Sequence, residues 1–140
     1  MISPHDDDME SVSSVVSVAV SANSEDSEGE EDFLRLLPMF EEHENLYADI
    51  SSLTQINKLG YLKRALAFSF THDRLVYGSD WPLQFFPLVS PWYQVKDVPV
   101  ASLKAISALK NTWDRDVALK RAMGTPESVF TRTGTLLKLE

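Results

Sequence analysis

The chain has 140 residues, a formal net charge of −8 and no cysteine, and 44% of its residues are hydrophobic. This length allows one modest domain with a real core, and no apolar run approaches the roughly 20 residues that cross a bilayer. Without cysteine there is no disulfide framework and no thiolate metal site. We therefore expect a cytoplasmic protein with no membrane partner.

The negative charge is concentrated in the N-terminal third. Residues 1–44 hold 13 acidic side chains and one basic one, whereas residues 45–140 hold 8 acidic and 12 basic ones. No basic stripe is evident and the acidic segment would repel phosphates, so we expect no nucleic-acid partner. Residues 1–10 are predicted to form an acidic, disordered leader, and residues 11–140 the single domain that follows it.

Strand and helix patterns alternate in the first part of the chain. Residues 11–21 are rich in valine and small side chains, which suits a strand buried on both faces. Apolar residues between 33 and 40 follow helical spacing, and Pro38 within them predicts a kink or two shorter helices. Residues 45–51 are predicted to form the next strand.

The alternation continues before the chain becomes helical. Residues 55–69 carry apolar side chains at helical spacing, and residues 74–77 read as a third strand. Residues 82–99 contain four prolines and are predicted to form a long loop. The remaining predicted elements are helices at 101–109 and 112–123, and a last helix with Thr125 as its N-cap and Pro126 in its first position.

The order strand, helix, strand, helix, strand favours an α/β fold with parallel strands. Three strands make only a small sheet, and such a sheet would leave open strand edges. The aromatic side chains of the loop from Trp81 to Tyr93 could wall a substrate pocket, or pack over the helices or against further barrel parts. Left uncovered, they would form an apolar patch. Both features predict self-association.

Asp80 is the first candidate for chemistry. The third predicted strand runs into Gly78, and Asp80 follows where the strand has ended, before Trp81 and Pro82. A carboxylate at the C-terminal end of a parallel strand lies where α/β proteins build active sites. The alternative is a loop carboxylate that orders the turn at Trp81. Asp49, inside the second strand pattern, is better interpreted as a structural carboxylate.

Three segments resemble the amidohydrolase-related superfamily of metal-dependent TIM-barrel enzymes, in particular its small-molecule decarboxylases and hydrolases. They are LLPMFEEHENLYADISSL at 36–53, DRLVYGSDWP at 73–82 and AMGTPESVF at 122–130. The resemblance is clearest over residues 30–135. It implies a partial (β/α)8 barrel, with the three strands as the last three of eight and helices after them. Asp80 would then bind a divalent metal, zinc or manganese, or accept a proton from its bound water.

The chain also departs from that family. Enzymes of the family carry a His-x-His pair on the first barrel strand, and no strand here corresponds to it. The strand at residues 15–20 ends without the histidine often found there. Of the three histidines present, His5 lies in the acidic leader, while His43 and His72 precede strands. Asp80 follows a strand, so these histidines are expected to lie far from it.

Two functions remain in competition. The chain resembles the C-terminal segment of a metal-dependent hydrolase that cleaves C–N or ester bonds, or decarboxylates, a small molecule, with most metal ligands missing. Alternatively, it is a catalytically inactive remnant that acts through binding or self-association. The second hypothesis is favoured for the isolated chain and the first for its ancestry.

Overall fold

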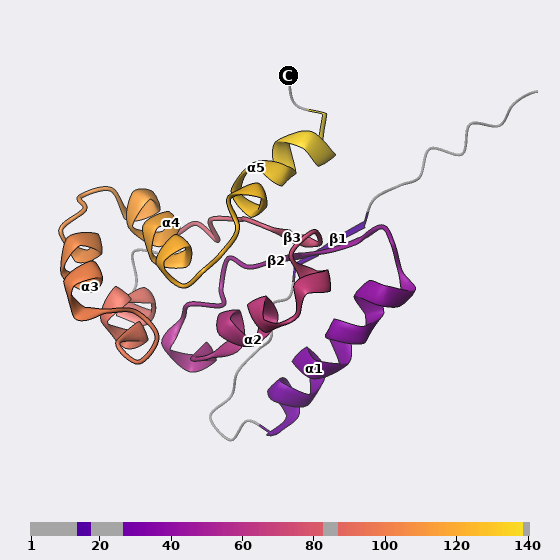
Figure 1. Cartoon of the computed structure of the whole chain (residues 1–140), viewed down its shortest axis with the longest axis horizontal. Helices are drawn as coiled ribbons and strands as arrows, with labels where there is room; N and C mark the ends of the chain where they lie inside the picture. Colours follow the sequence, from indigo (N-terminus) through magenta and orange to yellow (C-terminus); the bar gives the residue numbers. More distant parts are fainter. Residues whose placement is uncertain (1–13, 18–26, 83–86, 139–140) are drawn as a thin grey trace, which may run out of the picture.

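The computed structural model describes residues 14–17, 27–82 and 87–138 and shows a mixed α/β architecture around a small parallel sheet (Figure 1). The strands are β1 (Ser14–Ser17), β2 (Leu46–Asp49) and β3 (Leu75–Val76), in the order β1-β2-β3. Ala48 of β2 lies opposite Val16 of β1 and Leu75 of β3. The α/β class and the parallel strands are thus confirmed. The rest of the strand predicted at 11–21 lies outside the described residues.

Helices surround the sheet. They are α1 (Ser27–Glu42), α2 (Tyr61–Ala67), α3 (Val100–Ser107), α4 (Thr112–Ala122) and α5 (Glu127–Leu136), with 3-10 turns η1 (Ile56–Lys58), η2 (Ser69–Thr71), η4 (Pro87–Val89) and η5 (Pro91–Gln94). In Figure 1, α1 and α2 lie on one side of the sheet and α5 lies on the other. None of the helices in the described part of the chain has the length and apolar character needed to cross a bilayer.

Helix α1 runs through Pro38 as one continuous element, so the prediction of two shorter helices is wrong. A proline inside a helix removes one backbone hydrogen bond and crowds the preceding turn. Here the buried side chains of Phe33, Leu37 and Phe40 lie on one face and pack into the core. Burial of this face on both sides of Pro38 offsets the local cost of the proline.

The helix predicted at 55–69 is wrong as a single element. The structure divides it into η1, the short helix α2 and η2. Gly60 separates η1 from α2 with a φ of +86°, a left-handed conformation that a helix cannot contain and that glycine adopts readily. The apolar spacing therefore continues across a turn that breaks the backbone hydrogen-bond ladder.

The start of α5 also differs from the prediction. The helix begins at Glu127, its N-cap residue is Pro126, and no side chain caps it. The backbone N–H of Val129 donates to the Pro126 carbonyl at 3.0 Å. The hydroxyl of Thr125 is buried without a partner, so Thr125 is not the N-cap. Gly124, at a φ of +97°, turns the chain just before it.

The larger part of the core lies between the sheet and helices α1 and α2. Along β2 the buried residues Leu46 and Ala48 alternate with the half-buried Tyr47 and Asp49, as expected for a strand with one face in the core. A second buried cluster joins α3 to α4 and consists of Val98, Leu103, Ile106 and Leu119. Ile50 and Leu53, which follow β2, belong to the larger cluster, and Tyr77, which follows β3, packs against it.

The outer side of β3 is covered by α5. The backbone N–H of Tyr77 donates to the Val129 carbonyl at 3.1 Å, and the Arg132 guanidinium donates to the Leu75 carbonyl. The Thr133 hydroxyl approaches the Tyr77 carbonyl at 3.5 Å. The prediction of open sheet edges is therefore wrong for β3, because α5 provides the partners that a further strand would otherwise offer.

Candidate functional site at the carboxyl edge of the sheet

Asp80 lies beyond the carboxyl end of β3, where the sequence placed it. It is exposed and has a φ of +50°, a left-handed conformation that aspartate tolerates better than most residues. A cis peptide bond joins Trp81 to Pro82 directly after it. The turn thus holds the Asp80 carboxylate at the solvent-facing edge, which fits either predicted role, chemistry or the ordering of this turn.

Lys58 lies on η1, in the connection from β2 to α2, and faces the same edge. Its side chain is only 4% exposed, and its Nζ donates to the Ser52 Oγ at 2.9 Å. Burial lowers the pKa of Lys58, while the negative charge of Asp80 acts in the opposite direction. Asp80 is therefore within electrostatic reach of a buried ammonium group.

A second lysine lies beside the same edge. Lys120 of α4 is fully buried, and its Nζ lies 2.6 and 2.8 Å from the two carboxylate oxygens of Asp116. The same Nζ donates to the Ser51 carbonyl at 3.1 Å and lies 5.1 Å from the centre of the Tyr77 ring. Burial lowers the pKa of Lys120, whereas Asp116 favours the charged form. Lys120 joins α4 to the segments that follow β2 and β3.

Tyr77 completes this cluster. Its hydroxyl donates to Asp116 Oδ2 at 2.9 Å. Burial raises the pKa of Tyr77 well above its usual value, and the negative charge of Asp116 raises it further. The Asp116 carboxylate thus accepts from both Tyr77 and Lys120. A buried carboxylate with two such donors is a structural group that keeps its charge compensated.

Asp49 has the structural role that its sequence suggested. Its Oδ1 accepts from the backbone N–H of Ser51 at 2.6 Å and so stabilises the turn that follows β2. Its Oδ2 approaches the Gly78 backbone so closely that a Cβ added to Gly78 would lie 2.1 Å from it. The absence of a side chain at Gly78 therefore leaves room for the Asp49 carboxylate.

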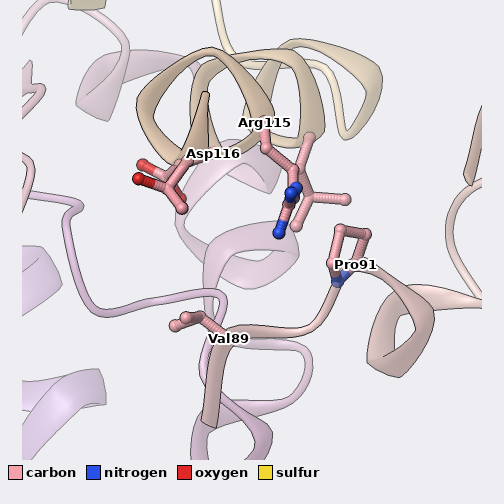
Figure 2. Close-up of a pocket in the computed structure, with 6 residues that line it drawn as sticks. Val89, Pro91, Arg115 and Asp116 are labelled. Carbon is pink, nitrogen blue, oxygen red and sulfur yellow. The ribbon is translucent and has the colours of Figure 1, made fainter. Parts of the chain in front are cut away.

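A small pocket lies next to the Asp116 cluster, between α4 and the η4–η5 segment (Figure 2). Its atom-free space is about 270 Å³, which includes some open solvent. Figure 2 shows Arg115 and Asp116 on the helix, facing Val89 and Pro91. The Arg115 side chain donates to the Leu109 carbonyl at 2.7 Å, but its Nε is buried without a partner. The loop predicted at 82–99 contributes Val89 and Pro91 to this pocket, whereas its aromatic residues Trp92 and Tyr93 do not line it.

The described residues do not fit a divalent metal. His43 and His72 precede β2 and β3, at the opposite end of the strands from Asp80, and the His72 ring contacts the Leu66 carbonyl at 2.8 Å. Across residues 14–17, 27–82 and 87–138 no three histidine, aspartate or glutamate side chains form a metal-binding group. Burial lowers the pKa of both Lys58 and Lys120, and the negative charge of Asp80 acts in the opposite direction on both. Ammonium groups, rather than further metal ligands, thus lie near the carboxylate that the resemblance assigns to a metal.

The sequence predicts Lys58 on the solvated side of the helix at 55–69, which is wrong because the structure buries it. The sequence does not single out Lys120 or Asp116. The spacing of Asp116 and Lys120, four residues apart in a predicted helix, was the available signal. Such a pair usually lies on a solvated helix face, where it contributes little. Only the packing of α4 against the strand ends makes it a buried pair.

Comparison with known proteins adds no relative. No protein-family model, curated protein or solved structure matches the chain. The similarity to amidohydrolase-related enzymes therefore rests on the three sequence segments alone.

Proposed function

We propose that the chain forms the last three β/α units of an amidohydrolase-type (β/α)8 barrel and contributes Asp80 to the site of a small-molecule hydrolase or decarboxylase. The observation that carries the proposal is the position of Asp80, exposed beyond the carboxyl end of a strand in a parallel sheet. This is the edge at which barrel enzymes place their catalytic groups. A cytoplasmic location is part of the proposal, because a chain without cysteine suits a reducing compartment.

The role proposed for Asp80 is proton transfer to or from the substrate. An exposed carboxylate at the edge can accept a proton, and the half-buried Ser79 and the exposed Trp81 flank it and can orient a bound molecule. Zinc or manganese belongs to the proposal through the resemblance alone. Because the described residues do not fit the metal, its other ligands would have to come from a second polypeptide or from residues that the structure does not describe.

The test compares Asp80→Asn with Asp114→Asn, which changes an exposed aspartate in the first turn of α4. Hydrolysis of nitrophenyl esters and anilides is measured with zinc or manganese added, and bound metal is measured by mass spectrometry. We expect the Asp80 variant to lose about 100-fold or more in kcat/KM, the usual scale for a general base, while the Asp114 variant keeps the wild-type rate. A wild-type chain that neither binds metal nor hydrolyses these substrates contradicts the enzymatic proposal.

A second proposed function is binding or self-association by a chain without catalytic activity. The observation that favours it is the exposure of large aromatic side chains. Trp81 and Trp113 stack with ring centres 5.7 Å apart, yet they remain 56% and 45% exposed, and Trp92 is 43% exposed. Exposed aromatic rings of this size are typical of protein interfaces.

Light scattering after gel filtration tests this function. We expect the wild-type chain to form dimers or larger species at micromolar concentration, and the double substitution of Trp81 and Trp113 by serine to shift it toward the monomer. The matched control is Phe68→Ser, at an exposed ring away from this pair. A wild-type monomer at high concentration contradicts self-association.

A further inference from the structure

Lys58 is a buried ammonium group with too few partners. Its side chain is 4% exposed, and among the described residues this side chain makes one hydrogen bond, to Ser52 Oγ at 2.9 Å. An ammonium group has three protons to donate. Within the described part of the chain no carboxylate lies within 4.0 Å of its Nζ. Burying a charge without a counter-ion is costly, so this position calls for a negatively charged partner.

The connection that carries Lys58 contains two hydroxyl groups with unused hydrogen-bonding capacity. Ser52 accepts from Lys58, which leaves its own hydroxyl proton available to donate. Thr54, on the same connection, is 1% exposed, and its hydroxyl has no partner. Asp80 is close enough to act on Lys58 through its charge, but the two do not form an ion pair.

Lys58 lies in the connection that follows the carboxyl end of β2. η1, which carries Lys58, packs against η4 after the loop that follows β3. Ligands of α/β proteins bind at this carboxyl edge, where the connections after the strands meet. An ammonium beside a hydroxyl matches the two oxygens of a small oxyanion, one oxygen accepting from each group.

We propose that Lys58 and Ser52 form a binding site for a small oxyanion, a carboxylate or a phosphate, that enters at the carboxyl edge beside Asp80. This inference rests on the proposed function in one respect: the bound oxyanion would be part of the substrate that lies next to Asp80. It requires no metal, because the ammonium group itself compensates the charge of the anion. In the unoccupied protein the Lys58 charge destabilises the fold, and an anion relieves this cost.

The experiment titrates the metal-free protein with sodium benzoate or sodium phosphate, using sodium chloride at equal ionic strength as the salt control. Thermal unfolding and the NMR signal of the Lys58 ammonium group report binding. Lys58→Met removes the charge and keeps the length of the side chain, and Lys104→Met changes an exposed lysine on α3. We expect Tm to rise with benzoate or phosphate but not with chloride. Which of the two salts acts distinguishes a carboxylate site from a phosphate site.

The variants separate an anion site from a structural lysine. Lys58→Met is expected to fold with a Tm no lower than that of the wild type without anion, and to bind at least about tenfold more weakly, the usual loss with a charged hydrogen bond. Lys104→Met should bind as the wild type does. No anion-dependent change in the wild type, or an equal change in Lys58→Met, overturns the proposal.

Asp80→Asn distinguishes this inference from the proposed function. The Asp80 carboxylate repels an anion held by Lys58, so its neutralisation should strengthen benzoate or phosphate binding severalfold. The same substitution should abolish hydrolysis if Asp80 is the proton-transfer group. Lys58-dependent anion binding without any hydrolysis supports the inference and contradicts the enzymatic proposal. Hydrolysis with no Lys58-dependent anion binding contradicts the inference and supports the enzyme.

Discussion

At the scale of single residues, the carboxyl edge depends on one position without a side chain. Gly78 allows the Asp49 carboxylate to approach the backbone after β3, and that carboxylate in turn stabilises the turn after β2 through the Ser51 N–H. The Asp49 carboxylate thus contacts the backbone that follows both strands. Backbone approach of this kind is a common reason for glycine at the end of a strand.

Gly78→Ala is expected to lower the free energy of unfolding by about 1–3 kcal/mol, the usual cost of overpacking, because the new Cβ would lie 2.1 Å from Asp49 Oδ2. Gly134→Ala is the matched control. It lies inside α5 with open space around its Cα, so it should raise stability by about 0.5–1 kcal/mol. Urea unfolding of both variants measures the difference, and equal stabilities would contradict the close contact at Gly78.

Tyr77 gives a prediction on pH. Its pKa is raised in the folded protein by burial and by Asp116, whereas in the unfolded chain it ionises near 10.0. Above pH 10 the folded protein therefore keeps the Tyr77 proton that the unfolded chain loses. The contribution of Tyr77 to the free energy of unfolding is complete below pH 10 and falls as the pH rises above 10. Tyr77→Phe should be less stable than the wild type at pH 7, and its deficit should shrink above pH 10. Unfolding measured from pH 7 to 11 tests this, and a constant deficit would contradict it.

The position of Asp80 could be predicted from the sequence, but the positions of the charged groups around it could not. A short apolar strand followed by Gly78 and Asp80 is a local pattern, so the edge position of Asp80 could be predicted. Lys58 and Lys120 look in the sequence like solvated helix residues, and only tertiary packing buries them. The same holds for Gly60, whose positive φ depends on how the connection returns to the sheet. Apolar spacing carries no information about either effect.

At the scale of elements, α5 acts as the outer neighbour of β3. Its Val129 carbonyl and its Arg132 guanidinium occupy the backbone groups that β3 turns away from β2. The Arg132 side chain is only 13% exposed, and it also reaches Ser128 Oγ at 3.0 Å. A helix thus stabilises a strand of two residues that pairs with β2 alone among the described strands.

Arg132→Met should lower the free energy of unfolding by about 1–2 kcal/mol, since it leaves the Leu75 carbonyl without its charged donor. Hydrogen exchange at the Tyr77 amide should become faster, because the contact between α5 and β3 opens more often. Arg121→Met is the control. Its ion pair with Glu127 is exposed and should contribute little. Unchanged exchange at Tyr77 in the Arg132 variant would show that α5 is held on β3 by other contacts.

At the scale of the whole molecule, polar contacts join the parts of the fold that hold the two buried clusters. The larger cluster joins the sheet to α1 and α2, and the smaller joins α3 to α4. Met123 contacts both clusters, and next to it in the fold Lys120 links α4 to the Ser51 carbonyl and the Tyr77 ring. The two parts are therefore expected to unfold together rather than one after the other.

Lys120→Met tests this coupling. The substitution leaves the buried Asp116 carboxylate without its cation, which should lower stability by about 3–5 kcal/mol. The double variant Lys120→Met with Asp116→Leu removes both charges and should recover much of the loss. Calorimetry and urea unfolding followed by fluorescence provide the measurement. If the double variant is as unstable as Lys120→Met, the ion pair itself is required, and the loss does not come from the unpaired Asp116 charge.

The covering of β3 by α5 has a consequence for any larger assembly. An edge strand has a single set of outward backbone groups, and α5 already uses the Leu75 carbonyl and the Tyr77 N–H. A barrel that closes through β3 would need these same groups for its first strand. In the proposed barrel, α5 would therefore have to leave its position on β3 before the first strand could pair there.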